Sequence, residues 1–92
     1  MIKVDNDYYI QADTYCYIVM KYQGKSKKGE DVYKTLSYPS SLKSAIEYIM
    51  KYKQRAFIND NNVDLKEALD QFEKINKEMY KKLKEIEKLE EL

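Results

Sequence analysis

The fold is decided by the stretch Tyr15-Cys16-Tyr17-Ile18-Val19-Met20-Lys21-Tyr22, the most aromatic and β-branched segment of the 92-residue chain. Residues of these types favour extended structure, so we predict a strand here. Asp13-Thr14 precedes this strand, and Gly24 and Gly29 follow it. These residue types are typical of turns. The strand should therefore pair in antiparallel fashion with a neighbour on each side.

Shorter extended segments flank this strand. We expect strands over residues 2–4, 8–12 and 32–38, because apolar, aromatic and β-branched residues gather there. Asp5-Asn6-Asp7 has a turn composition, since Asx side chains accept hydrogen bonds from nearby backbone amides. Residues 23–31 carry both glycines among lysines, so they are expected to form a solvated hairpin loop.

The rest of the chain is predicted to form two helices. Pro39 ends the last strand, because proline cannot continue a ladder of backbone hydrogen bonds. Ser40 or Ser41 can then cap a first helix, in which the apolar residues follow helical spacing. Asp64 can cap a second helix that contains no glycine or proline.

The expected architecture is one α+β domain over residues 1–92. An N-terminal antiparallel β-meander of three or four strands precedes two helices, the second long and amphipathic. The meander is expected over residues 1–38, the first helix over 40–56 and the second over 64–90.

Composition narrows the class of protein. The chain is 43% hydrophobic and 36% charged with a net charge of +1, and no apolar run is long enough to span a bilayer. The N-terminal residues carry no stretch typical of a secretory signal, which indicates a cytoplasmic location. Histidine, the commonest general base and metal ligand, is absent. We therefore expect no enzyme, no cofactor and no metal site.

The single cysteine is predicted to be structural. Strand alternation places Cys16, Ile18, Met20 and Tyr22 on one face of the central strand, which we interpret as the core face. With no histidine in the chain to activate the thiol, Cys16 is expected to be a buried, unreactive residue.

Tyrosine is the residue in most conspicuous excess, with ten in the chain. If the face described above is the core, Tyr15 and Tyr17, with Tyr9 and Tyr33 from neighbouring strands, form an aromatic patch on the open face of the sheet. Tyrosine offers large contact area with a polar end, so the patch is typical of a protein interface, and it can also stack unpaired bases. The alternative is that these tyrosines simply cover a half-exposed sheet.

Lysines gather around the predicted hairpin. Lys21, Lys25, Lys27 and Lys28, together with Lys34, can meet phosphates or an acidic groove in a protein partner. The alternative is a solvated loop whose lysines protect the edge of the sheet from aggregation.

The second helix has a heptad pattern. Leu65, Phe72, Met79 and Ile86 lie seven residues apart. We expect the half up to Met79 to pack within the chain. In the charged last part, Leu83, Ile86 and Leu89 are predicted to form an interface with a second chain, although such a seam is more often part of an intramolecular core.

Two stretches carry a resemblance to known proteins: Tyr8-Tyr9-Ile10-Gln11-Ala12-Asp13-Thr14-Tyr15-Cys16-Tyr17-Ile18 and Tyr38-Pro39-Ser40-Ser41-Leu42-Lys43-Ser44-Ala45-Ile46. Together with the basic hairpin, they resemble small uncharacterised proteins encoded by phages and mobile elements of low-GC bacteria. Such proteins are similar in size to phage inhibitors of host machinery, anti-CRISPR proteins among them. The resemblance implies this class and transfers no residue roles.

Three functions follow as expectations. The first is a non-catalytic phage or mobile-element protein that binds and modulates a host protein in the host cytoplasm, with anti-CRISPR-type inhibition as one form of this activity. The second is a nucleic-acid-binding accessory protein that uses the lysine hairpin and the sheet tyrosines. The third is a homodimeric assembly protein joined through the C-terminal helix.

Overall fold

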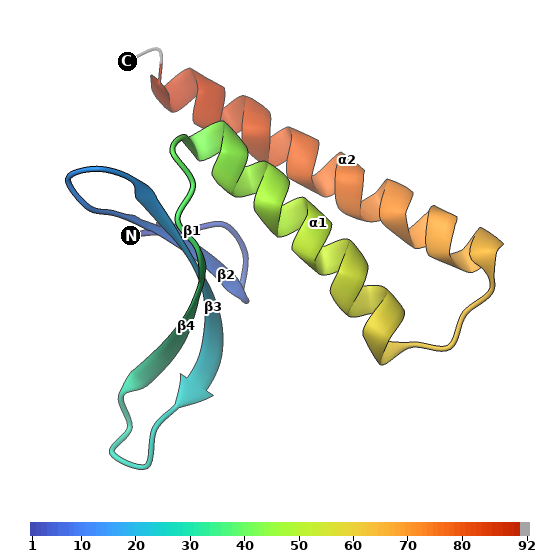
Figure 1. The fold of residues 1–92 in the computed structure, drawn as a ribbon, viewed down its shortest axis with the longest axis horizontal. Helices are drawn as coiled ribbons and strands as arrows, with labels where there is room; N and C mark the ends of the chain where they lie inside the picture. Colours follow the sequence, from blue (N-terminus) through green and yellow to red (C-terminus); the bar gives the residue numbers. More distant parts are fainter. Residues whose placement is uncertain (91–92) are drawn as a thin grey trace. The chain divides into compact units, whose positions relative to one another are not determined.

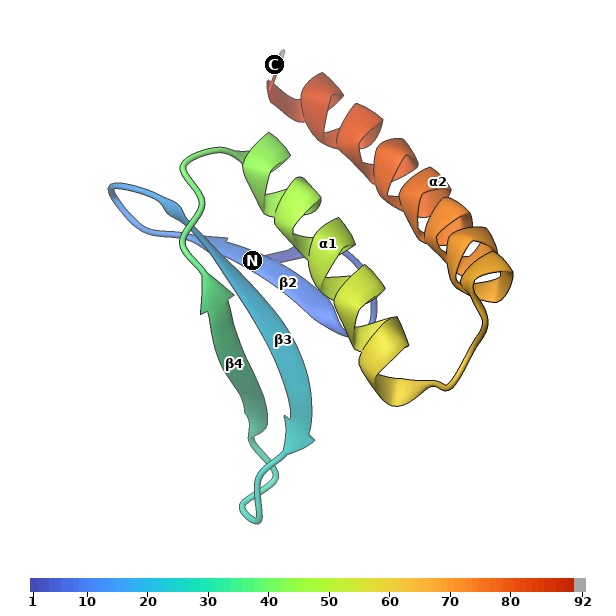
Figure 2. The ribbon, with the colours of Figure 1, turned by 45° about the vertical axis from the view of Figure 1, so that its right-hand side comes forward.

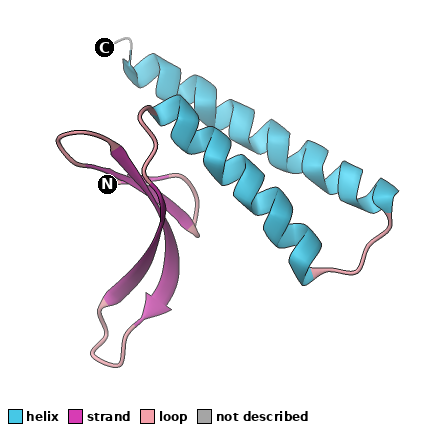
Figure 3. Cartoon of the chain, in the orientation of Figure 1, coloured by secondary structure: helices cyan, strands magenta, loops and turns pink. Residues whose placement is uncertain are grey.

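The computed structural model describes residues 1–90, with side chains through Lys88, and confirms the α+β fold class. A four-stranded antiparallel sheet in the spatial order β1-β2-β3-β4 comes first, and two helices follow (Figure 1). Figure 3 shows that every strand precedes both helices in the chain. The elements are β1 (Ile2–Lys3), β2 (Tyr8–Ala12), β3 (Tyr17–Lys25), β4 (Asp31–Ser37), α1 (Leu42–Asp60) and α2 (Leu65–Glu90).

The chain divides into two compact units, Met1–Ala45 and Ile46–Leu92. The first unit contains the whole sheet and the first turn of α1. The second contains the remainder of α1 together with α2.

Two aspartates build the first two turns of the sheet by the same device. Oδ1 of Asp5 accepts hydrogen bonds from the backbone amides of Asp7 and Tyr8, over 2.8 and 2.9 Å. Oδ1 of Asp13 accepts from the amides of Tyr15 and Cys16, both over 2.8 Å. These carboxylates satisfy amides that the turns leave without strand partners, as the Asx compositions predict.

The β3–β4 hairpin is longer and its loop shorter than expected. We predicted a loop over 23–31, but β3 continues to Lys25. Gly24, with φ of 93°, lies where two residues of β3 oppose one residue of β4, which is a β-bulge. The tight turn that follows uses Gly29, with φ of 81°, whose amide donates to the carbonyl of Ser26. A residue with left-handed backbone geometry after such a turn is a common way to close a short hairpin. Because the two glycines make the bulge and this tight turn possible, the paired strands extend further than we expected.

The face of β3 that we expected to be open carries its most buried residue, so the predicted core face is wrong except for Met20. Tyr8, Ile10 and Val19 are buried, with Val19 fully so, and the strand register places them on one face, since Ile10 pairs with Val19. The same face carries Tyr17, which we expected on the open side. The prediction fails because alternation groups residues by face but does not say which face is buried. Met20 is also buried, from the opposite face.

The second unit is an antiparallel helical hairpin, in which α1 and α2 lie side by side in both views (Figure 1 and Figure 2). Helix α1 ends at Asp60, four residues later than predicted. Nε2 of Gln54 donates to Oδ1 of Asn76 over 2.7 Å, which links the two helices. Among the side chains of this unit that the structure describes, the buried apolar ones are Ile46, Ile49, Ala68, Ile75, Met79 and Ile86. Within residues 1–90, neither helix is both long and apolar enough to cross a membrane.

Both helices begin at capping residues. Oγ of Ser41 accepts a hydrogen bond from the amide of Ser44 over 3.1 Å, and Oδ1 of Asp64 accepts from the amide of Glu67 over 2.9 Å. Each bond satisfies one of the amides that the first turn of a helix leaves free. Of the two serines that we considered for the first cap, the structure selects Ser41.

Replacing Ser41 by alanine therefore tests this cap. We expect Ser41→Ala to lower the free energy of unfolding by about 1 kcal/mol, the usual cost of losing a side-chain N-cap. Ser40→Ala is the matched control and should change stability by no more than a few tenths of a kcal/mol, because no capping bond is lost. Urea unfolding monitored by circular dichroism measures both, and an equal effect of the two substitutions would contradict the assignment.

Candidate functional site

Three tyrosines from three strands meet on one face of the sheet. The ring centroids of Tyr9 and Tyr33 lie 5.2 Å apart with the planes at 79°, and those of Tyr22 and Tyr33 lie 5.4 Å apart. Tyr9 and Tyr22 complete the group at 6.3 Å. These separations and the edge-to-face geometry are those at which aromatic rings attract one another. We call these three residues the tyrosine cluster.

The strand register explains why these rings meet. Tyr22 of β3 lies directly opposite Tyr33 of β4, so their side chains share a face. Tyr9 of β2 pairs with Met20, two residues before Tyr22, and therefore lies diagonally across from it on the same face. All three rings are half-buried, which leaves part of each available to a partner.

A polar network borders the cluster. Oδ1 of Asp31 accepts a hydrogen bond from the hydroxyl of Tyr22 over 2.9 Å and another from the ammonium of Lys25 over 3.0 Å. These bonds, that of Lys25 first, lower the pKa of Asp31 below its ordinary value of 3.8. The bond to Asp31 raises the pKa of Tyr22, and desolvation followed by the charge of Asp31 raises the pKa of Tyr33. Both shifts favour the protonated phenol, and the hydroxyl proton of Tyr22 is already donated to Asp31.

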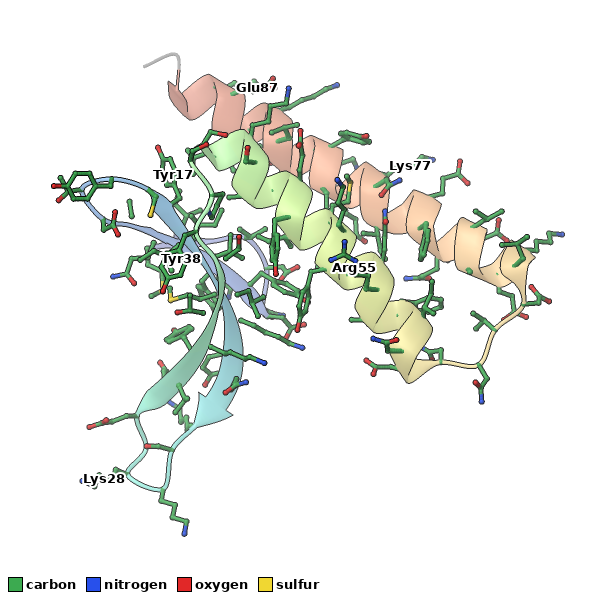
Figure 4. The ribbon with its side chains drawn as sticks, in the orientation of Figure 1. Tyr17, Lys28, Tyr38, Arg55, Lys77 and Glu87 are labelled. Carbon is green, nitrogen blue, oxygen red and sulfur yellow. The ribbon has the colours of Figure 1, made fainter. Side chains whose placement is uncertain are left out.

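The hairpin lysines divide into three groups. Lys25 is held by Asp31, whereas Lys27 and Lys28 are exposed at the tip of the hairpin, where Figure 4 labels Lys28. Lys21 is half-buried, and it lies opposite Lys34 on the face away from the tyrosine cluster. Of the lysines expected to gather around the hairpin, only Lys25, Lys27 and Lys28 therefore lie at or near its tip.

Of the four tyrosines predicted to form the patch, the structure brings together only Tyr9 and Tyr33. Tyr15 lies outside the strands, in the β2–β3 turn, and is 92% exposed. Tyr17 pairs with Ala12 and so belongs to the opposite face. Tyr22 was missed, because we assigned its face to the core. The adjacent buried aliphatic pair Ile10 and Val19 was the signal that could have identified the true core face.

Cys16 is half-exposed and precedes β3, which corrects its expected place on a buried strand. Its thiol donates to Oδ2 of Asp13 over 3.7 Å. Desolvation, and then the negative charge of Asp13, raise the pKa of the thiol. Residues 12–17 and Ser40 surround it in a shallow depression. A raised pKa lowers the fraction of thiolate, which is the nucleophilic form of cysteine.

The predicted oligomer interface is only partly at the surface. Ile86 is 5% exposed and Leu83 is half-buried. The side chain of Leu89 lies outside the described residues. Ile86 therefore belongs to the buried seam of α2, which heptad spacing alone does not distinguish from a seam between chains.

In the described part of the chain, no group of three cysteine or acidic side chains is placed to hold a metal ion. Comparison with models of protein families, with curated proteins and with solved structures finds no match for this chain.

The hydrogen bonds of Asp31 predict how the stability of the protein depends on pH. Because the folded-state pKa of Asp31 is lowered, its stabilising contribution is present above its unfolded value and is lost as pH falls through the folded value. In a titration followed by nuclear magnetic resonance, the Asp31 carboxyl should titrate below 3.8. Lys25→Met should move that midpoint upward, since Lys25 is its main partner, whereas Lys27→Met should leave it in place.

Proposed function

We propose that this protein is a non-catalytic binding protein that docks on a host protein through the tyrosine cluster and the basic hairpin tip, and acts by occluding the surface it covers. The observation that carries the proposal is the cluster itself. Tyr9, Tyr22 and Tyr33 present three partly exposed rings on one face of a hydrogen-bonded sheet.

The cluster has the properties of a preorganised binding surface. Tyrosine loses little conformational entropy on binding, because it has only two side-chain torsions and a large rigid ring. Here each ring already contacts the other two, and Tyr22 is held further by Asp31. A partner therefore meets side chains whose ordering has largely occurred during folding, which raises affinity for a given contact area.

The hairpin tip adds a charge that suits an acidic partner surface. Lys27 and Lys28 are exposed at the end of a ribbon that extends beyond β2 (Figure 2). Exposed lysines of this kind mainly accelerate encounter with an oppositely charged surface and orient it. We assign the tip to recognition of an acidic groove and the cluster to the contact that holds the partner.

We base the proposed class of target on the resemblance to small phage and mobile-element proteins. Within that class, a protein without catalytic groups acts by binding a component of the host cell. Inhibition of a bacterial defence protein, in the manner of anti-CRISPR proteins, is the form of this activity that we propose. The site of action is then the host cytoplasm.

Substitution in the cluster tests the proposal. Host proteins retained by the immobilised chain are identified by mass spectrometry, and the candidate is purified and its binding measured by calorimetry. We expect Tyr33→Ala to weaken binding at least tenfold, because truncated aromatic anchors typically cost about 2 kcal/mol or more. Tyr33→Phe keeps the ring and should bind within a fewfold of the original.

Tyr15→Ala is the matched control, since Tyr15 is exposed but lies outside the cluster. It should leave affinity unchanged. Thermal melting of each variant verifies that the sheet is intact. If Tyr33→Ala binds as tightly as the original chain, the cluster is not the docking surface.

A nucleic-acid-binding function is the second candidate, and the shape of the hairpin favours it. A two-stranded β-ribbon fits the major groove of duplex DNA, and Lys27 and Lys28 lie where such a ribbon would approach phosphates. Fluorescence anisotropy with labelled single- and double-stranded oligonucleotides at about 50 mM salt tests it.

On this second reading, affinity falls steeply with added salt, and Lys27→Ala/Lys28→Ala reduces the slope of that dependence by about two, one unit for each lost phosphate contact. Lys66→Ala/Lys74→Ala is the matched control, since it removes two exposed lysines far along the chain on α2. No binding to either form of oligonucleotide excludes this candidate.

A further inference from the structure

Helix α2 carries a second apolar strip besides its buried seam. Leu65, Leu69 and Tyr80 are 76%, 56% and 54% exposed. The half-buried Phe72 and Leu83 belong to the same row, and Asn76 lies between them. These six positions recur at intervals of three or four residues, so they lie along one side of the helix. We call these five apolar residues the outer strip. It extends over about 27 Å at 1.5 Å per residue.

The outer strip borders the seam that builds the second unit, because Asn76 on the line of the strip accepts a hydrogen bond from Gln54 of α1. Ala68, Ile75, Met79 and Ile86 are buried, whereas the three most exposed strip residues are among the few large apolar side chains that the described chain leaves at its surface. Burial of such side chains is favourable, so the exposed Leu65, Leu69 and Tyr80 on one side of the helix are typical of an interaction surface.

Charges along the outer edge of the strip change sign from one end to the other. Asp70 and Glu73 come first, beside the N-terminal half, and Lys77, Lys81 and Lys84 follow. Lys66 is the one exception at the acidic end. All of these side chains are exposed, and Figure 4 shows Lys77 on α2.

We propose that the occupant of the outer strip is a second copy of this chain, with its α2 antiparallel to the first. In this arrangement Leu69 of one copy meets Tyr80 of the other, close to a two-fold axis. Glu73 then lies across from Lys77 of the second copy twice, and Asp70 lies across from Lys81 in the same way. Lys66 lies across from Lys84, and this one pair of like charges opposes the contact. In a parallel pair, the outer edge of each copy would instead face the opposite flank of the strip in the other copy, where α1 lies.

The pairing is expected to be weak. Few large apolar side chains are exposed in the strip, which indicates an interface at or below the lower end of the usual range for stable complexes. A dissociation constant of about 10–100 µM is consistent with such a contact. The dimer would carry two sheets and thus two tyrosine clusters, so this inference adds to the proposed function without depending on it.

Sedimentation velocity of the full chain over a concentration series up to about 500 µM tests the pairing, since that range brackets a Kd of this order. We expect the mass to rise toward that of a dimer. Leu69→Glu should abolish the rise, because it places a charge in the strip at a position already exposed in the single chain. Glu78→Lys is the matched control on the other side of α2 and should dimerise as the original does.

A charge exchange tests the antiparallel register. Glu73→Lys alone should weaken dimerisation at least threefold, and adding Lys77→Glu should restore it, since the opposite charges then face each other again with their places exchanged. Helix content by circular dichroism should be the same in all variants. A monomer mass at every concentration, an unaltered dimer in Leu69→Glu, or failure of the charge exchange to restore pairing would each overturn the proposal.

Discussion

The pairing of β3 with its two neighbours is the constraint on which the candidate site depends. Because side chains alternate along a strand, a slip of one residue would move every side chain of a strand to the other face. The observed register sets Ile10 against Val19 on the buried face and Tyr22 against Tyr33 on the other. The same pairing that forms the core of the first unit therefore assembles the tyrosine cluster.

Several local interactions hold this register. The carboxylates of Asp5 and Asp13 tie down the backbone amides of the first two turns, and Gly24 absorbs an extra residue in β3 without moving the tyrosines out of register. Asp31 then joins Tyr22 and Lys25 across the hairpin. These groups are exposed or half-buried, so each bond is modest in energy, but together they restrict the conformations open to the cluster.

Much of the fold could be predicted, because its signals are local. A turn residue or a cap such as Asp64 determines the backbone only a few positions along the chain. The spacing of apolar residues likewise indicates a helix from neighbouring positions alone. The buried face of the sheet and the role of Tyr22 could not be predicted, since they depend on contacts between strands. Likewise, heptad spacing placed Ile86 and Leu65 on one seam, but in the structure Ile86 is buried whereas Leu65 is exposed. Position along the helix, rather than spacing, makes that difference.

The extension of the β3–β4 ribbon has a consequence for dynamics. The last backbone hydrogen bond between β3 and the chain before β2 runs from the amide of Tyr22 to the carbonyl of Asp7, and beyond Tyr22 each strand of the hairpin has only the other as a neighbour. A two-stranded ribbon is marginally stable by itself, and its amides should open locally without unfolding of the rest of the sheet. Amide protons near the tip should therefore exchange with solvent much faster than those around Val19. The chain thus combines a rigid aromatic surface with an adaptable basic arm, which can change conformation to follow a partner while the surface below it keeps its shape.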